Sequence, residues 1–164
     1  MSSAHAVRQG AQKKIVTMYR QGRPLNSGPL EGAMNVLIAD DDTGFRATLK
    51  RLLEAREGTG TVWEAADGEE AIRYARDLNP DVVLIDLAMP RIDGMEATRL
   101  IKAAQPEVFV VVCTVHNEPI YRRVATLNGA DGFLQKTDFR SGISLIDRLF
   151  QENRAWAERR MGEA

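Results

Sequence analysis

The stretch Asp81–Gly94 constrains the fold of this chain more than any other part of the sequence. It contains an unbroken run of branched apolar residues, Val82–Ile85, which is typical of a strand buried on both faces of a parallel sheet. Asp86 follows this run directly, and Pro90 with Asp93-Gly94 predicts that the chain turns soon afterwards. Open α/β folds bind ligands at the carboxyl ends of their parallel strands, so we expect Asp86 to lie at such an edge.

Apolar runs alternate with segments of helical periodicity along the rest of the chain. This alternation predicts an α/β fold, a doubly wound five-stranded parallel sheet with helices on both faces and right-handed crossovers. The predicted strands are Asn35–Ala39, Thr61–Ala65, Val82–Ile85, Val108–Thr114 and Gly132–Gln135. Helices are predicted after Asp42 or Thr43, after Asp67-Gly68, over Met95–Ala104, over about Pro119–Leu127, and from about Arg140 into the region 154–160. Gly58-Thr59-Gly60 is interpreted as the turn between the first helix and the second strand.

Composition places the chain among ordinary soluble globular proteins. Its 164 residues, 44% apolar and 27% charged, suffice for one domain with a core. The net charge of −1 favours no direct contact with nucleic acid, and no apolar stretch approaches the roughly 20 residues of a membrane span. The single cysteine, Cys113, fits a reducing compartment, so a cytoplasmic location is expected.

The two ends of the chain differ in composition from its middle. Residues 1–33 hold five basic residues against one acidic residue and are punctuated by Gly, Ser and Pro. We interpret them as a flexible basic N-terminal extension, residues 34–150 as the folded domain, and residues 151–164 as a C-terminal helix extension or tail.

Acids and their partners follow successive predicted strands. Asp40 and Asp41 end the first strand, Asp86 the third, Thr114 the fourth and Lys136 the fifth. Because these ends share one edge, the carboxylates repel one another, by about 4 kcal/mol for two charges about 4 Å apart at an effective dielectric constant near 20. Such a cluster favours Mg²⁺ with oxygen ligands. The pattern predicts phosphoryl transfer to Asp86, with the Lys136 charge and the Thr114 hydroxyl on the phosphoryl oxygens.

These motifs together resemble the receiver domain of two-component response regulators. The matching stretches are Val-Leu-Ile-Ala-Asp-Asp-Asp, Pro-Asp-Val-Val-Leu-Ile-Asp-Leu-Ala-Met-Pro-Arg-Ile-Asp-Gly, Val-Val-Val-Cys-Thr and Gly-Ala-Asp-Gly-Phe-Leu-Gln-Lys, within about residues 34–150. The resemblance implies a flavodoxin-like, CheY-like sheet with strand order 2-1-3-4-5.

The resemblance also implies roles for individual residues. Asp86 corresponds to the phosphoacceptor. Asp41 corresponds to the direct Mg²⁺ ligand, together with Asp86 and the main-chain carbonyl of Ala88, and Asp40 to the outer acid that reaches the metal through water.

The resemblance also implies how the protein would bind the phosphoryl group and respond to it. Thr114 and Lys136 correspond to the pair that grips it, and Phe133 corresponds to the aromatic switch position, which follows the inward movement of Thr114. Phe133 equally fits plain core packing. The face formed by helix 119–127, strand 132–135 and the last helix would then change its binding properties or form a homodimer.

The first hypothesis is therefore a phosphorylation-dependent switch rather than a metabolic enzyme. Its phosphodonor would be a sensor histidine kinase or a phosphotransfer protein, and its downstream target is an unknown protein. Lys136-Thr137-Asp138 resembles receivers that usually precede a helix-turn-helix output domain, yet only 14 residues follow Phe150, so we expect a stand-alone receiver.

Three alternatives remain from the sequence. A Mg²⁺-dependent phosphatase of the haloacid-dehalogenase type also uses an aspartyl phosphate, but Asp40-x-Asp42 is followed by Gly44 rather than Thr, and the larger cap domain is missing. The chain could also be a phosphorylation-independent interaction module, or a receiver cut from a longer transcription regulator.

Overall fold

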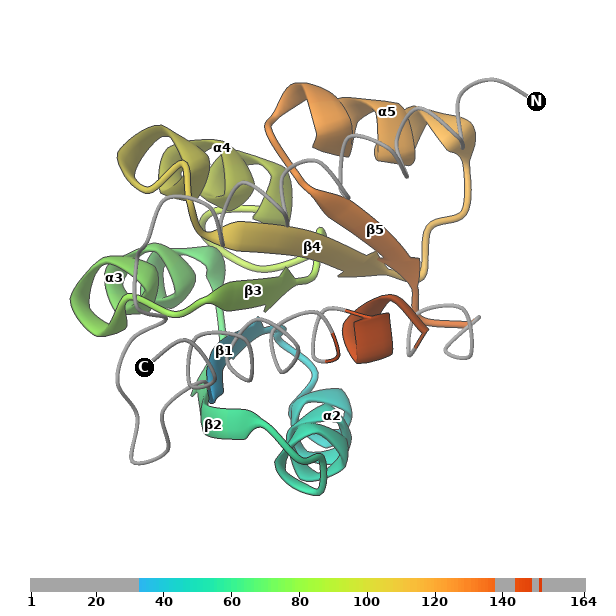
Figure 1. The fold of residues 1–164 in the computed structure, drawn as a ribbon. Coiled ribbons are helices and arrows are strands. Elements are labelled where there is room, and N and C mark those ends of the chain that lie inside the picture. The colour runs from blue at the N-terminus through green and yellow to red at the C-terminus, as the bar shows by residue number, and fades with distance from the viewer. Residues whose placement is uncertain (1–32, 138–143, 149–150, 152–164) are drawn as a thin grey trace.

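Five parallel strands form one sheet in the computed structural model, which describes residues 33–137, 144–148 and 151 (Figure 1). The strands are β1 (Met34–Ala39), β2 (Thr59–Ala65), β3 (Val82–Ile85), β4 (Phe109–Thr114) and β5 (Gly132–Gln135). The helices between them are α2 (Thr43–Glu54), α3 (Gly68–Leu78), α4 (Gly94–Ala104) and α5 (Pro119–Leu127). The strand order is β2-β1-β3-β4-β5, which confirms the predicted fold class.

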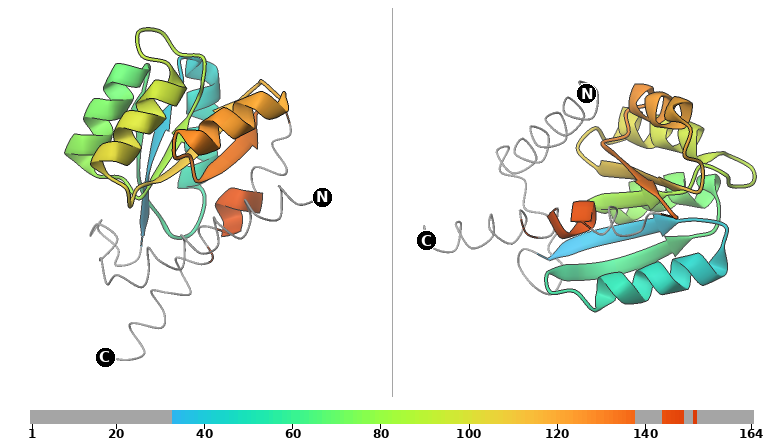
Figure 2. Two further views of the ribbon diagram at one scale, coloured as in Figure 1. Left: turned by 90° about the horizontal axis from the view of Figure 1, so that it is seen from above. Right: turned by 90° about the vertical axis from the view of Figure 1, so that its right-hand side faces the viewer.

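Helices cover both faces of this sheet (Figure 2). Successive residues of a strand point to opposite faces, so each central strand supplies both halves of the core. Ile38 and Leu84 pack with α2 and with the helical residues 144–148, whereas Leu37 and Val83 pack with α3, α4 and α5. Burying a side chain of this size stabilises the fold by about 1.5–3 kcal/mol.

Aspartates begin three of the helices. Asp42, Asp67 and Asp93 each accept hydrogen bonds from backbone N–H groups in the first turn of α2, α3 and α4, respectively. These N-caps satisfy donors that have no partner within the helix. Helices α2 and α3 therefore start within a few residues of the preceding strand, whereas the longer loop 86–93 separates β3 from α4.

Strand β2 begins two residues earlier than predicted, at Thr59. Of the two glycines in the predicted turn Gly58-Thr59-Gly60, only Gly58, with φ of 83°, lies in the left-handed region that suits a turn. Gly60 belongs to the strand, and a Cβ atom there would overlap the side chain of Asn35. The Asn35 side chain instead accepts a hydrogen bond from Thr61 N at 2.8 Å, so the glycine makes room for a bridge between strands.

The ends of the chain lie largely outside the described residues. Residues 144–148 are helical, as predicted for that segment, while the remaining parts of the last helix, the N-terminal extension and the C-terminal tail stay predictions. Within the described ranges, no helix has both the length and the apolar character needed to cross a bilayer.

Gly94→Ala is expected to destabilise the protein by about 2 kcal/mol or more, because the added Cβ would overlap the backbone carbonyl of Asp86. Chemical denaturation of both proteins measures the difference in free energy of unfolding. Gly44→Ala is the matched control, because Gly44 also lies in a first helical turn but its nearest neighbour would be a side-chain oxygen of Asp42, 3.3 Å away. Equal effects of the two substitutions would contradict the tight packing at Gly94.

Candidate functional site

The sheet brings the predicted site residues to one edge. Asp40 follows β1, Asp86 follows β3, Thr114 ends β4 and Lys136 follows β5. Backbone hydrogen bonds continue past the strand ends: Asp86 N donates to Ala39 O at 2.8 Å, and Lys136 N donates to Thr114 O at 2.8 Å. The backbone hydrogen bonds of the sheet therefore fix the Cα positions of these residues.

Three carboxylates form a cluster at this edge. Ligand oxygens of Asp40, Asp41 and Asp86 lie within 4.8 Å of one another. Asp40 and Asp86 are buried, with 1% and 5% of their surface exposed, whereas Asp41 is exposed. Two carboxylates that are shielded from solvent thus lie next to one that water and ligands can reach.

Lys136 provides the positive charge that faces these acids. Its Nζ lies 2.5 Å from Asp40 Oδ2 and 3.4 Å from Asp86 Oδ2. Burial lowers the pKa of Lys136, but the two carboxylates outweigh burial and hold that pKa above its ordinary value. The ammonium group therefore stays charged at neutral pH.

Asp86 is the unusual carboxyl of the cluster. Its burial raises its pKa above the ordinary value, and the neighbouring Asp40 charge raises it further, while Lys136 opposes both effects. A carboxylate with a raised pKa is a stronger base than an exposed one. In a site at the edge of a sheet, such a group is a candidate for chemistry.

Oxygen donors of this kind fit a hard divalent cation such as Mg²⁺. Asp40 Oδ2 is buried and accepts no hydrogen bond within the described ranges, although it pairs with the Lys136 charge. The three carboxylates lie together here, the Lys136 ammonium group pairs with two of them, and the Arg46 guanidinium donates a hydrogen bond to Asp40 O at 2.5 Å.

The loop after Asp86 is fixed at several points. Leu87 O accepts hydrogen bonds from the N–H groups of Met89 and Gly94, at 3.2 and 2.9 Å. Ala88, whose carbonyl is the predicted metal ligand, is exposed in this loop. The loop that carries it is thus tied back onto the residue next to Asp86.

An ion pair that the sequence does not predict anchors the same loop to the start of α3. Arg91 has φ of 67°, a conformation that side chains rarely adopt, and its guanidinium pairs with the buried carboxylate of Asp67. A hydrogen bond from Glu70 N, with help from Arg91, holds the pKa of Asp67 below its ordinary value despite burial. An arginine in a sequence does not predict a left-handed backbone conformation, so Arg91 could not be singled out from its own residue type.

Thr114 ends β4, and Phe133 lies on the neighbouring strand β5. Thr114 is fully buried, and its hydroxyl accepts a hydrogen bond from His116 N at 3.2 Å. Phe133 is half-buried on β5 among side chains of the core below α5, and the Arg122 guanidinium lies 4.6 Å from its ring centre. The roles of Thr114 and Phe133 in switching stay predictions.

A family model described as the response regulator receiver domain matches residues 36–149. The chain belongs to the response regulator receiver domain family. Phosphorylation-dependent switching in two-component signalling is the standard function of this family. Receiver domains generally depend on Mg²⁺, and the acid cluster offers oxygen donors of the type Mg²⁺ prefers.

Individual response regulators are similar to this chain in sequence and in structure. The response regulator UvrY of Escherichia coli strain K12 is 42% identical over 104 residues, 63% of this chain and 47% of that protein. A LuxR-family two-component response regulator from Aurantimonas sp. SI85-9A1 has a similar structure (TM-score 0.67, 32% identity, 73% of this chain and 86% of that one). The response regulator domain of Thermotoga maritima CheB is also similar (TM-score 0.66, 29% identity, 74% and 97%). The chain spans about half the length of the curated relatives it matches.

Asp86→Asn is expected to stabilise the protein at pH 7 in buffer without divalent cations, by on the order of 1 kcal/mol, because it removes a buried charge next to Asp40. The folded-state pKa of Asp86 is raised, so the wild-type protein gains stability as the pH falls through that pKa. The advantage of the variant should therefore shrink on acidification and vanish below about pH 3.9, the ordinary value.

Chemical denaturation from pH 3.5 to pH 7.5 measures this difference in free energy of unfolding. The control is Asp77→Asn, an exposed position whose pairing with Arg76 lies at the surface, so the stability change should be small. An Asp86→Asn protein less stable than the wild type at pH 7 would show that Lys136 outweighs burial.

Proposed function

We propose that Asp86 is the phosphoacceptor of a two-component signalling switch. One observation carries the proposal: a buried carboxylate with a raised pKa stands at the end of β3, with Lys136 Nζ 3.4 Å away and the oxygens of Asp40 and Asp41 beside it. This arrangement combines a nucleophile, a fixed cation and oxygen donors for a metal in one small site.

The chemistry assigned to Asp86 is phosphoryl transfer from a phosphohistidine. An Asp86 oxygen forms the new bond to phosphorus while the bond from phosphorus to the donor nitrogen breaks, and the donor keeps that electron pair. Lys136 stabilises the negative charge on the phosphoryl oxygens as a point charge, and the Thr114 hydroxyl donates a hydrogen bond to one of them. The proposal makes the protein a signalling phosphoacceptor and not a metabolic enzyme.

The acid cluster would hold Mg²⁺. Asp41, Asp86 and the main-chain carbonyl of Ala88 are the proposed direct ligands, and Asp40 would act through water. The bound cation would supply charge neutralisation for the transferring phosphoryl group. The exposure of Asp41 and Ala88, against the burial of Asp40, supports this division.

The proposed donor is a sensor histidine kinase or a phosphotransfer protein, acting in the cytoplasm on a domain that spans residues 34–150. The proposed output surface includes α5 and β5, where a downstream protein or a second copy of the chain would bind. Ile120 and Leu127 of α5 are 57% and 76% exposed, and exposed apolar side chains on one helix support a role in protein contacts. Phe133, on the adjacent strand, would connect this surface to Thr114.

Incubation with Mg²⁺ and acetyl phosphate is expected to add one phosphoryl group to the wild-type chain, measured by intact-protein mass. The addition should require Mg²⁺ and should be absent in Asp86→Asn, because an amide is not a nucleophile for this transfer. The exposed Asp77→Asn variant, with the same chemical change, should be phosphorylated like the wild type.

Phosphorylation that persists in Asp86→Asn would show that another residue is the phosphoacceptor. A wild-type protein that stays unmodified by acetyl phosphate and also fails to bind beryllofluoride would favour a phosphorylation-independent module. A partner that binds the wild type and Asp86→Asn equally well would support the same conclusion.

A further inference from the structure

An aromatic ring lies directly against the lysine of the candidate site. The Nζ of Lys136 is 4.4 Å from the ring centre of Phe45, which belongs to the first turn of α2. A cation within about 6 Å of an aromatic face is attracted by the negative potential of the ring. The same ammonium group contacts Asp40 and Asp86, so Phe45 adds an uncharged contact to a charged site.

The position of Phe45 follows from the cap of its helix. The Asp42 side chain accepts a hydrogen bond from Phe45 N at 3.0 Å, so α2 starts almost immediately after the acid pair of β1. Phe45 packs against the core cluster below α2 rather than facing solvent alone. Asp42, which caps α2, thus also helps to determine where the Phe45 ring lies.

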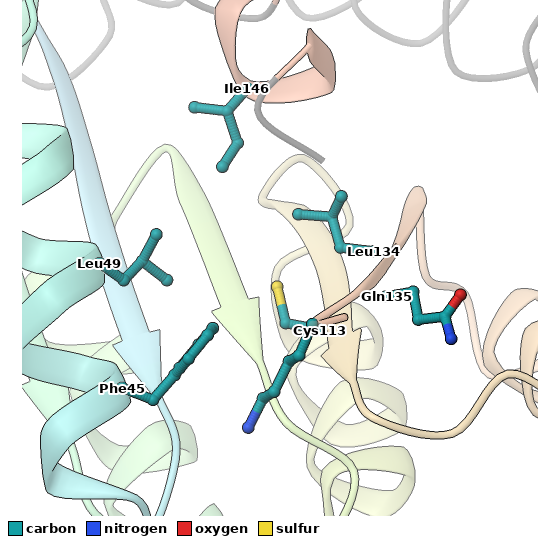
Figure 3. A pocket seen from close by; sticks show the side chains of 7 residues that line it. Phe45, Leu49, Cys113, Leu134, Gln135 and Ile146 are labelled. Atoms are coloured by element: carbon teal, nitrogen blue, oxygen red, sulfur yellow. The ribbon is translucent and has the colours of Figure 1, made fainter. Parts of the chain in front are cut away.

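A small cavity lies beside this contact. It is lined by apolar groups of Phe45, Leu49, Cys113, Leu134 and Ile146, together with Lys136. Figure 3 shows the Phe45 ring extending from α2 into the cavity, opposite Leu134 and Cys113. Burial raises the pKa of the Cys113 thiol, so the thiol is neutral and supplies no charge to hold the ammonium group. The lysine stem therefore borders an apolar space, and its charged end lies where that space meets the acids.

We propose that Phe45 is a positioning residue for phosphoryl transfer, whose ring face holds the Lys136 ammonium group at the acid cluster. This inference rests on the proposed role of Asp86 as phosphoacceptor. Lys136 Nζ is nearer to Asp40 than to Asp86, at 2.5 Å against 3.4 Å, so the ammonium group shifts toward Asp86 when a phosphoryl group arrives there. A ring face attracts the cation across its whole area, so it restricts the lysine to this region while permitting that shift.

The test compares Phe45→Leu with Phe45→Tyr in the full 164-residue chain. Leucine keeps an apolar side chain but has no ring, whereas tyrosine keeps the ring face. The measured quantities are the rate of phosphorylation by acetyl phosphate with saturating Mg²⁺, by intact-protein mass, and the apparent affinity for beryllofluoride, by calorimetry. Thermal unfolding of each variant separates loss of fold from loss of function.

Phe45→Leu should lower both the rate and the affinity by about fivefold, and Phe45→Tyr should stay within about twofold of the wild type. Leu49→Val trims another wall of the same cavity and should also stay near the wild-type values. The decisive comparison repeats Phe45→Leu in a Lys136→Ala background. If the ring acts through the lysine, Phe45→Leu has no further effect there.

Wild-type rate and affinity in Phe45→Leu would overturn the inference, as would an equal loss with and without Lys136. Both outcomes leave Asp86 phosphorylation in the wild type intact, so they do not touch the proposed function. Absence of phosphorylation and of beryllofluoride binding in the wild type itself would remove the proposed function and this inference with it.

Discussion

Two carboxylates are buried next to each other at the carboxyl edge of the sheet, and the fold has to compensate for their charge. Asp40 and Asp86 are almost fully buried on neighbouring strands, and the Lys136 ammonium group contacts both. Transfer of a carboxylate from water to a protein interior costs free energy unless charge or hydrogen bonds compensate for it. Three carboxylates cluster beside this one ammonium group, and this is the arrangement in which we propose that a cation binds.

The fold holds that charge in place through its backbone. Parallel strands in the order β2-β1-β3-β4-β5 bring β1 and β3 side by side and put β4 and β5 next to them, so residues far apart in sequence share one edge. Backbone hydrogen bonds past the strand ends fix the backbone positions of Asp86 and Lys136. Gly94 packs closely on the Asp86 carbonyl and holds the same backbone from the other side of the loop. The Arg91–Asp67 pair anchors the loop that follows Asp86. These contacts preorganise the backbone from which the side chains of the site extend.

Sequence patterns predicted the fold class and brought together the residues of the candidate site for a physical reason. Buried parallel strands read as apolar runs, and the residue after each run must lie at the same edge, so Asp40, Asp86, Thr114 and Lys136 could be grouped without coordinates. The strand order itself came from family resemblance.

Other features depend on contacts between distant segments. Phe45 gives the same helical-spacing signal as any core residue, and only the position of Lys136 distinguishes it. The sequence predicts a turn at Gly60, whereas the residue that requires a glycine there, Asn35, lies on another strand. Arg91 adopts a left-handed conformation that its own sequence does not predict, because a buried partner, Asp67, holds it there.

A crystal structure of the chain with Mg²⁺ and beryllofluoride would show whether Asp86 and the acid cluster bind as proposed. Beryllium is expected to be bonded to an Asp86 oxygen, with the metal held by Asp41, Asp86 and the Ala88 carbonyl, and with the Lys136 ammonium group moved from Asp40 onto a fluoride. Beryllofluoride on another residue, or a metal bound away from the acid cluster while Lys136 keeps its pair with Asp40, would contradict this proposal.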